Sequence, residues 1–424
     1  MSRVELPEDL LLSCMRCGFC LPACPTYREM EVESASPRGR IALLRAVMDG
    51  DLDLLDIGSK LDACLGCRAC EPACPAGVQY GAILEQGRAA LAAVRPNPWP
   101  VRFAYRYLLG SPLGIRLAGW GLWLYQRFGL RWLARRLRLV ERLGGKGLAA
   151  MERAVPEAVS PWRRASWARP LPPTGEPRLK VGFFTGCVAE ILFFETNRSA
   201  IEVLTHLGCE VALVPGQGCC GAVHGHAGEH DLAVAQAKRN IAAFEQGGYD
   251  YIVNTAGGCG AALNEYGRLL AGDPTWADRA NRFAAACRDF AELVDALGPI
   301  PLGALPGRIT YQDSCHLRNV QKVAQPPRNL LKAIPGAEYV ELPEADRCCG
   351  AAGTYAITQA LLSDQILDRK MTHVATSGAA TIVVANPPCH LEMIEGIERA
   401  GLADRVQVKH IADLLAEAMR NRVC

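Results

Sequence analysis

Short apolar runs alternate with longer stretches of helical periodicity from about residue 178 to the end of the chain. The runs form two similar sets, at 180–186, 211–214 and 251–254, and then at 308–313, 339–342 and 381–386. Strands that alternate with helices favour right-handed crossovers and a parallel sheet. The pattern therefore predicts an α/β fold for this half, and ligands in such folds bind outside the carboxyl ends of the strands.

Cysteines repeat in step with these runs, at offsets of 128, 129 and 130 residues. They form two sets of four: Cys187, Cys219, Cys220 and Cys259, then Cys315, Cys348, Cys349 and Cys389. Matched offsets of this kind indicate two copies of one domain, which we place at 178–300 and 301–424. Each cysteine follows the end of a predicted strand, so we expect one ligand to collect the four thiols of a copy.

The pattern is different between residues 99 and 172, where there is no cysteine. Nine arginines and a single acid, Glu141, occur between Arg102 and Leu143. Helical spacing places five of them on one side of a predicted amphipathic helix: Arg127, Arg131, Arg135, Arg138 and Arg142. Such a helix either lies in an anionic membrane interface or docks on a partner subunit or on the chain's own domains. A Pro-rich linker at 169–173 completes the region 99–177.

Two tight cysteine clusters lie within residues 1–98, each with the spacing C-x2-C-x2-C-x3-C-P. This run is typical of a [4Fe–4S] cluster, and in two-cluster ferredoxins the fourth cysteine of each run ligates the other cluster. We therefore assign the first cluster to Cys14, Cys17, Cys20 and Cys74, and the second to Cys64, Cys67, Cys70 and Cys24. Zinc is the alternative, but structural zinc sites usually take two ligands from each of two separated knuckles.

Ser36, Pro37 and Gly50 predict a helix between the two clusters, with a capping serine, a proline in the first turn and a closing glycine. The N-terminal domain is therefore predicted to be helical. Arg38 and Arg40 at the start of this helix either offset the negative charge of a thiolate-ligated cluster or belong to an ordinary solvated helix start.

The C-terminal cysteines resemble the cysteine-rich domain of heterodisulfide reductases, with its Cys-Cys-Gly (CCG) turn. Both copies depart from that family at one position, where Ala256 and Asn386 replace the first cysteine of a closing C-x-x-C. Four thiols remain in each copy, so one or two further iron–sulfur clusters are expected here, and their type stays open. A vicinal disulfide, zinc or simple burial are the alternatives.

Three further cysteines and five histidines have less specific sequence patterns. Cys209, Cys287 and Cys424 have no counterpart in the other copy and are interpreted as structural thiols. Five histidines lie near the CCG cysteines, and they act either as proton carriers or in capping and turns: His224, His226, His230, His316 and His390.

Composition narrows the function classes. The chain has 424 residues with 46 basic and 44 acidic side chains, and no nucleic-acid motif accompanies this net charge of +2. The first residues lack a secretory signal pattern, and no stretch reaches roughly 18 consecutive apolar residues, so we expect a cytoplasmic chain that is not an integral membrane protein. Clustered cysteines in a reducing compartment favour metal binding. We find no Gly-rich dinucleotide fingerprint or flavin site.

Two ferredoxin motifs followed by two CCG domains resemble the iron–sulfur subunits of bacterial glycolate oxidases. Four strings carry the resemblance: FTGC at 184–187, GCCGAVHGHAG at 218–228, YQDSCHLRNV at 311–320 and CCGAAGTY at 348–355. The resemblance implies an oxidoreductase complex in which an FAD-binding flavoprotein subunit oxidises glycolate to glyoxylate. This chain would pass the electrons towards a membrane quinone from the cytoplasmic face of the inner membrane, and it would have no catalytic residue of its own.

Related systems share this architecture, namely lactate utilisation, anaerobic glycerol-3-phosphate dehydrogenase and heterodisulfide reductase. Two further classes are a catalytic subunit that reduces a disulfide at the CCG sites and an iron–sulfur sensor or scaffold. The missing fifth cysteines disfavour the first of these, and four cysteine motifs exceed what sensing needs. The sequence thus predicts an α+β multidomain chain, with a helical ferredoxin-like domain and two parallel-sheet CCG domains.

Overall fold

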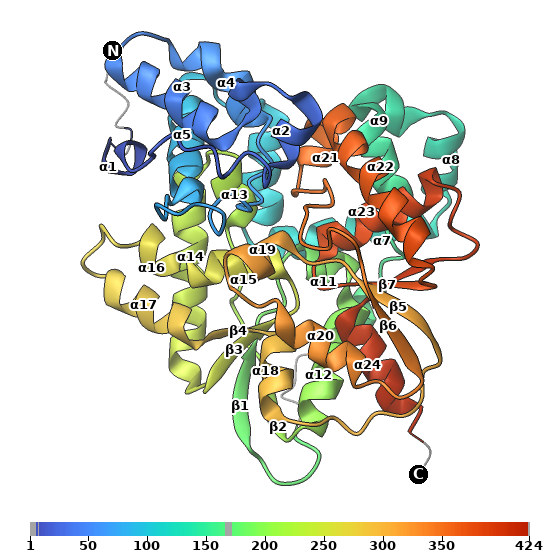
Figure 1. Ribbon diagram of the computed structural model, residues 1–424. Coiled ribbons are helices and arrows are strands. Elements are labelled where there is room, and N and C mark those ends of the chain that lie inside the picture. Colours follow the sequence, from blue (N-terminus) through green and yellow to red (C-terminus); the bar gives the residue numbers. More distant parts are fainter. Residues whose placement is uncertain (1–5, 7, 166–171, 423–424) are drawn as a thin grey trace.

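The computed structural model describes residues 6, 8–165 and 172–422, and it has three parts (Figure 1). A helical part formed by the N-terminal residues lies beside two α/β units that each contain one parallel sheet. The arginine-rich segment packs on both units, with residues 105–122 against the first and α9 (Leu139–Ala154) against the second. Of the predicted linker, residues 169–171 lie outside the described residues, as does Cys424, and the domain boundaries stay predictions.

The N-terminal part is a set of short helices around two cysteine loops. Its helices are α1 (Glu8–Leu12), α2 (Pro25–Met30), η1 (Glu33–Ala35), α3 (Pro37–Asp49), α4 (Leu54–Asp62) and α5 (Tyr80–Val94). The predicted start of α3 is confirmed, since the Ser36 hydroxyl accepts a hydrogen bond from the backbone N–H of Gly39. Gly50 ends α3 in the left-handed conformation, as its place after the last apolar residue predicts. Ile41, Leu44, Leu61 and Ile83 form the core of this part.

Each α/β unit contains a four-stranded parallel sheet, with strand orders β2-β1-β3-β4 and β6-β5-β7-β8. The strands are β1 (Leu179–Phe183), β2 (Cys209–Leu213), β3 (Tyr251–Asn254), β4 (Cys287–Asp289), β5 (Gly307–Tyr311), β6 (Ala337–Glu341), β7 (Thr381–Val384) and β8 (Gln407–His410). Three strands of each sheet match the predicted runs. The fourth strands, β4 and β8, were missed because they are short and carry charged residues such as Arg288 and Lys409.

Helices cover both faces of the sheets. Those of the first unit are α11 (Val188–Leu192), α12 (Phe194–His206), α13 (Ala222–His226), α14 (His230–Phe244), η3 (Glu245–Gly247), α15 (Gly257–Asn264), α16 (Tyr266–Leu269), α17 (Ala277–Ala286) and α18 (Phe290–Leu297). Those of the second are α19 (Cys315–Asn319), α20 (Gln325–Lys332), α21 (Tyr355–Thr358), α22 (Ala360–Ser377), α23 (Pro387–Arg399) and α24 (Ile411–Arg420).

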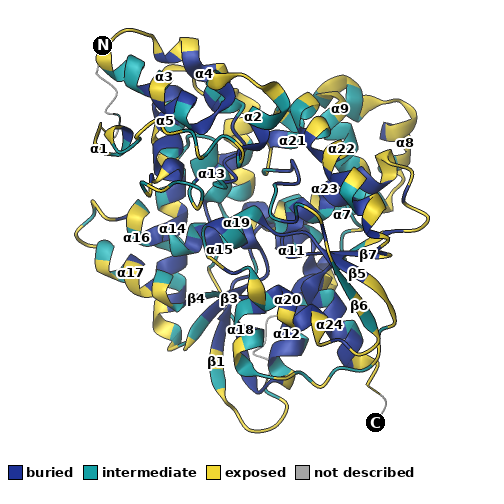
Figure 2. Cartoon of the chain, in the orientation of Figure 1, coloured by how far each residue is buried: buried dark blue, intermediate teal, exposed yellow. Residues whose placement is uncertain are grey.

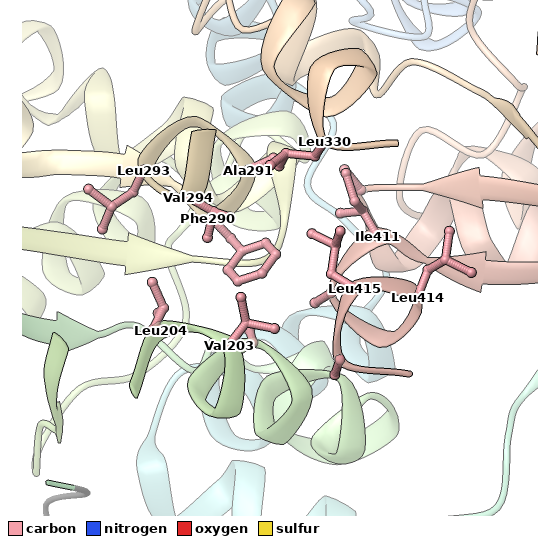
Figure 3. Close-up of a cluster of buried hydrophobic side chains, with 14 of the residues drawn as sticks. Val203, Leu204, Phe290, Ala291, Leu293, Val294, Leu330, Ile411, Leu414 and Leu415 are labelled. Carbon is pink, nitrogen blue, oxygen red and sulfur yellow. The ribbon is translucent and has the colours of Figure 1, made fainter. Parts of the chain in front are cut away.

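The two α/β units share one hydrophobic core. Phe290 and Val294 of α18 in the first unit point towards Ile411 and Leu415 of α24 in the second, and Val203 of α12 joins them (Figure 3). All of these side chains are buried. Burial of this kind stabilises a structure by roughly 1.5–3 kcal/mol per large apolar side chain. The two units are therefore held in a fixed relation.

The arginine-rich segment is not the single amphipathic helix that its periodicity predicts. It contains α6 (Trp99–Phe103), the π-helix η2 (Ala104–Leu109), α7 (Pro112–Arg127), α8 (Leu130–Arg136), α9 (Leu139–Ala154) and α10 (Pro161–Ala165). Gly129 and Arg138 take left-handed conformations and break the helix at both ends of α8. Four of the five arginines are therefore spread over α7, α8 and α9, and Arg138 lies in the break between α8 and α9. The prediction that the five share one face of a helix is wrong.

None of the described helices is both long enough and apolar enough to cross a membrane. Most residues between 127 and 139, on and around α8, are exposed (Figure 2).

Candidate metal centres

The second cysteine loop brings three buried thiols together with one from the first loop. Cys64, Cys67 and Cys70 are all buried, and Cys24, at the end of the first loop, is buried with them. Burial and the neighbouring thiols of Cys67, Cys64 and Cys24 raise the pKa of the Cys70 thiol well above its ordinary value. The fourth cysteine of one run thus lies beside the first three of the other.

The first loop is more open. Cys14, Cys20 and Cys74 are partly buried against the N-terminal core, whereas Cys17 is exposed. Partial burial raises the pKa of Cys20, and the thiols of Cys14 and Cys24 add to the shift. The structure therefore places Cys14 near Cys20, and the full ligand set of this loop stays a prediction.

Polar groups surround the sulfur of Cys64. The backbone N–H of Gly66 and the hydroxyl of Tyr80 donate to Cys64 Sγ at 3.4 and 3.5 Å. Burial alone would raise the pKa of Cys64, but the charges of Arg40 and Arg88, with the Tyr80 hydrogen bond, bring it below its ordinary value. These are the conditions in which a thiol becomes a thiolate ligand.

In the first α/β unit the four predicted cysteines meet at the sheet edge. Cys187 precedes α11, Cys219 and Cys220 form the turn before α13, and Cys259 lies in the first turn of α15. The Sγ atoms of Cys187 and Cys219 are 3.4 Å apart. Hydrogen bonds from the thiols of Cys219 and Cys259 bring the pKa of Cys220 well below its ordinary value, although burial opposes this shift. One ligand can therefore contact all four.

The second unit repeats this arrangement. Contact with the Cys348 thiol, with His316 close by, lowers the pKa of Cys315 to about 5. Cys349 lies between Cys348 and Cys389, and hydrogen bonds from these two thiols lower its pKa well below the ordinary value.

The position of the missing fifth cysteine has a defined role in the second unit. The side-chain amide of Asn386 donates to Cys389 Sγ at 3.4 Å, and its carbonyl oxygen accepts from the backbone N–H of Gly258 in the first unit at 3.1 Å. Asn386 therefore supports a thiol where the related family has another ligand, and it also joins the two units. Ala256, its counterpart in the first unit, has no side-chain polar group.

The glycine of each Cys-Cys-Gly turn is required by the backbone. Gly221 has φ +88° and Gly350 has φ +104°. A Cβ would lie 3.2 Å from the carbonyl oxygen of Ala233 in the first case and 3.0 Å from that of Ser363 in the second. This turn also directs the backbone N–H of Gly221 at Cys219 Sγ, at 3.4 Å.

The donor set fits iron–sulfur clusters. Clusters of this type are held by thiolates, and backbone N–H groups around the sulfurs set their properties. Within the described residues, no three His, Cys, Asp or Glu side chains are arranged to hold a single metal ion. A cluster takes one thiolate per iron at separate corners, so it does not need that arrangement.

The second ferredoxin loop directly contacts the second α/β unit. Cys67 shares a small buried apolar cluster with Cys348, Tyr355 and Ile366, and Cys315 packs against it. The proximity of Cys315 contributes to the raised pKa of Cys67, after burial. Two of the predicted sites are therefore adjacent, although Cys67 and Cys348 are 281 residues apart in the sequence.

Two of the predicted histidines lie between the α/β units. The rings of His226 and His316 are stacked with centroids 5.6 Å apart, and His316 Nδ1 is 3.7 Å from Cys315 Sγ. His224 instead contacts the carbonyl oxygen of Tyr105 through Nε2 at 3.0 Å, which is a structural role. His390 packs against the ring of Phe193, and His230 begins α14.

Several residues around the sites carry no motif that would reveal them. Asn240 donates to the carbonyl oxygen of Cys219, and the Tyr266 hydroxyl donates to that of Cys220, both at 2.8 Å. Asn319 donates to the carbonyl oxygen of Cys67 at 2.9 Å. In the sequence, the one feature that could mark such residues is a polar side chain at an apolar position of a helix. Many residues with a purely structural role have the same feature. Cys209 and Cys287 lie within strands and are buried, in agreement with their interpretation as structural thiols.

Three family models match the chain. A 4Fe-4S dicluster domain matches residues 10–78, and a cysteine-rich domain matches twice, at 181–264 and 309–394. Residues 96–155 match the linker region of glycolate oxidase iron-sulfur subunits. Together these matches agree with the predicted order of a dicluster domain, a middle region and two repeats.

Two of the relatives match nearly the whole chain. A Bacillus subtilis (strain 168) protein named "Probable glycolate oxidase iron-sulfur subunit" is 43% identical over 98% of this chain and 95% of its own length. The glycolate oxidase iron-sulfur subunit of Escherichia coli (strain K12) is 32% identical over 97% of this chain and 95% of its own. Lactate utilization protein A of Geobacillus kaustophilus (strain HTA426) is 35% identical, but it matches only 56% of this chain and 98% of its own.

Proposed function

This chain belongs to the family of glycolate oxidase iron–sulfur subunits, which are parts of an oxidoreductase complex, and from that membership we propose that it relays electrons between a flavoprotein subunit and a membrane quinone. In this proposal the flavoprotein oxidises glycolate to glyoxylate, which releases two electrons and two protons. The electrons pass singly through this chain, and a quinone takes up two electrons and two protons to become a quinol.

The ligands follow the sequence assignment. Cys14, Cys17, Cys20 and Cys74 hold one [4Fe–4S] cluster, and Cys64, Cys67, Cys70 and Cys24 hold a second. The two CCG sets hold one further iron–sulfur cluster each. When bound, such clusters accept and release single electrons. The chain's own residues bury the thiols of the second loop and donate hydrogen bonds to the sulfur of Cys64. Burial and hydrogen bonds of this kind set a reduction potential.

The observation that carries this proposal is the contact between the second ferredoxin loop and the second CCG set. Cys67, Cys348 and Tyr355 are buried together, and Cys315 packs against them. His226 and His316 then connect the two CCG sets, because His316 lies beside Cys315 and His226 lies near Cys220. Adjacent sites of this kind form a continuous route through the molecule, as a relay requires.

The decisive experiment uses the intact complex purified without oxygen. Glycolate should bleach the visible absorption of the iron–sulfur clusters, and a soluble quinone analogue should restore it. Glyoxylate should appear in equal amount to the quinol. If glycolate is oxidised but the clusters never change redox state, the relay proposal is wrong.

The same preparation tests the other candidate functions. D-lactate and L-lactate are added in place of glycolate, because a protein named for lactate utilisation is 35% identical to this chain over 56% of its length. A disulfide substrate is added to the reduced complex. If lactate bleaches the clusters and glycolate does not, the complex oxidises lactate. Turnover of the disulfide would support a catalytic subunit instead.

We also propose that the arginine-rich segment places the complex on the cytoplasmic face of the inner membrane. Most exposed large apolar side chains of the described chain occur between residues 99 and 143, among them Trp99, Phe128, Trp132 and Leu143. Nine arginines lie between Arg102 and Leu143, and all of them except Arg131 are exposed. Exposed apolar and arginine side chains together match an anionic lipid interface, where each basic residue contributes about 1 kcal/mol.

Replacing the exposed apolar residues of α8 should release the complex from anionic vesicles. In the triple variant Leu130→Ser, Trp132→Ser and Leu133→Ser, binding should weaken at least about tenfold, since 1.4 kcal/mol corresponds to tenfold and three inserted side chains contribute more than that. Co-sedimentation with vesicles of anionic and of zwitterionic lipid measures the effect. The matched control replaces three exposed residues elsewhere, Leu55, Val94 and Leu361. If the triple variant binds vesicles as the wild type does but no longer retains a partner subunit, this surface binds that subunit and not the membrane.

A further inference from the structure

Arg40 is a fully buried arginine in the N-terminal part. It lies in the first turn of α3, four residues after the Ser36 cap, and its relative exposure is 0%. Arg38, two residues earlier, is instead partly exposed and forms an ion pair with Glu33 at 2.7 Å. The two arginines, which the sequence could not separate, therefore have different environments.

The hydrogen bonds of Arg40 leave one nitrogen without a partner. Its Nε donates to the carbonyl oxygen of Lys60 at 2.7 Å, and its Nη2 donates to the Thr26 hydroxyl at 3.1 Å. Nη1 is buried and has no hydrogen-bond partner among the described residues. Neither of these partners is a carboxylate, nor is Tyr80, whose hydroxyl also contacts the guanidinium. Burying a guanidinium without a counter-charge strongly destabilises a fold. A negatively charged neighbour is therefore needed.

Arg40 lies between cysteines from the two different loops. Thr26, to which it donates, has its hydroxyl 3.2 Å from Cys24 Sγ. On the other side Arg40 is close to Cys64 and Tyr80, and the Tyr80 hydroxyl donates to Cys64 Sγ. Cys24 and Cys64 are both assigned to the second cluster. The guanidinium therefore faces the place where thiolates of both loops would meet.

We propose that Arg40 is a positioning residue of the second cluster, whose free Nη1 donates to a sulfur of that cluster and whose charge stabilises the reduced state. The inference rests on the proposed ligation of this cluster by Cys64, Cys67, Cys70 and Cys24. Positive charge and hydrogen bonds to sulfur raise a cluster's reduction potential, because reduction adds negative charge. Arg40 also joins α2, which follows the first loop, to α4, which precedes the second, through its hydrogen bonds to Thr26 and Lys60.

The test is a redox titration of the anaerobic complex, followed by electron paramagnetic resonance (EPR), so that each cluster is observed without turnover. Arg40→Gln removes the charge, and Arg40→Lys keeps a charge but cannot keep both hydrogen bonds and reach the sulfur. Both variants should lower the midpoint potential of the second cluster, Arg40→Gln further than Arg40→Lys, and leave that of the first cluster unchanged. Arg95→Gln is the control, since Arg95 is exposed in the same part of the chain and pairs with Asp62.

The outcomes separate this inference from the proposed function. A wild-type complex without two N-terminal cluster signals would overturn the proposed function itself. If both Arg40 variants titrate like the wild type, or no further than Arg95→Gln, Arg40 has no role at the cluster. Should Arg40→Gln fail to load the second cluster, Arg40→Lys decides: a lowered potential supports the proposal, and a wild-type potential overturns it.

Discussion

Replacing Cys24 with serine should remove or alter the cluster of the second loop and spare that of the first. Cys24 ends the first motif in the sequence, but it is buried beside Cys64, Cys67 and Cys70. If it ligates the second cluster, the variant should lose roughly four iron atoms per chain, or retain a cluster with an altered EPR signal. The reduced first cluster should keep its signal but lose the magnetic interaction with its neighbour.

Three further variants make this result unambiguous. Cys67→Ser marks the second cluster, because Cys67 is buried within that loop, and Cys17→Ser marks the first. Cys24→Ser should give the same spectrum as Cys67→Ser. Cys209→Ala, a buried cysteine within β2, is the control and should leave both signals unchanged. A Cys24→Ser spectrum that matches Cys17→Ser would show that each loop holds its own cluster, and the crossed ligation would be wrong.

Replacing Cys315 with serine should interrupt the relay. Cys315 lies beside Cys348 and packs against the buried cluster that contains Cys67, so it occupies the junction of two sites. Removing a residue that hydrogen-bonds to a metal ligand lowers metal affinity or activity roughly 10–100-fold, and removing the ligand itself should lower them at least as much. We therefore expect glycolate-dependent quinone reduction by the complex to fall at least tenfold.

The cause of this loss can be checked in the same protein. Iron content should fall only by the amount bound to the second CCG set, and the EPR signals of both N-terminal clusters should remain. Cys287→Ala provides the control, since Cys287 is buried in β4 with its thiol directed at the carbonyl oxygen of Phe283. Full quinone reduction by Cys315→Ser would place the second CCG set outside the route of the electrons.

The sequence predicted the parts of the fold that depend on local periodicity and on repeated spacing. Three strands of each sheet, the cap of α3 and the duplication of the α/β unit all have local signals. The fourth strands do not, because β4 and β8 are three and four residues long and include charged side chains. Tertiary packing defines such short strands, and a single sequence contains little trace of it.

The helix breaks around α8 show a second limit. The spacing of Arg127, Arg131 and Arg135 is consistent with a continuous helix, yet Gly129 and Arg138 adopt positive φ angles of 74° and 51°. Gly129 is a visible signal, since glycine tolerates this conformation. Arg138 is not, because arginine is a good helix former and only the surrounding structure holds it in a left-handed conformation.

The candidate sites were predictable as sets of cysteines but not in their surroundings. Ligand spacing is a local property, so the eight N-terminal and eight CCG cysteines could be named from the sequence. The contact of Cys67 with Cys348, the donation from Asn386 to Cys389 and the burial of Arg40 depend on how separate segments pack. None of them has a sequence pattern, because a hydrogen bond between distant residues leaves no periodicity.

One measurement tests the central claim most directly, namely that these thiols hold iron and sulfide. Iron, acid-labile sulfide and zinc are counted per chain in the complex purified without oxygen, together with a Mössbauer spectrum. We predict at least about eight iron and eight sulfide from the two N-terminal clusters, with further iron from the CCG sets and no stoichiometric zinc. A colourless protein that contains zinc and no sulfide would contradict the account.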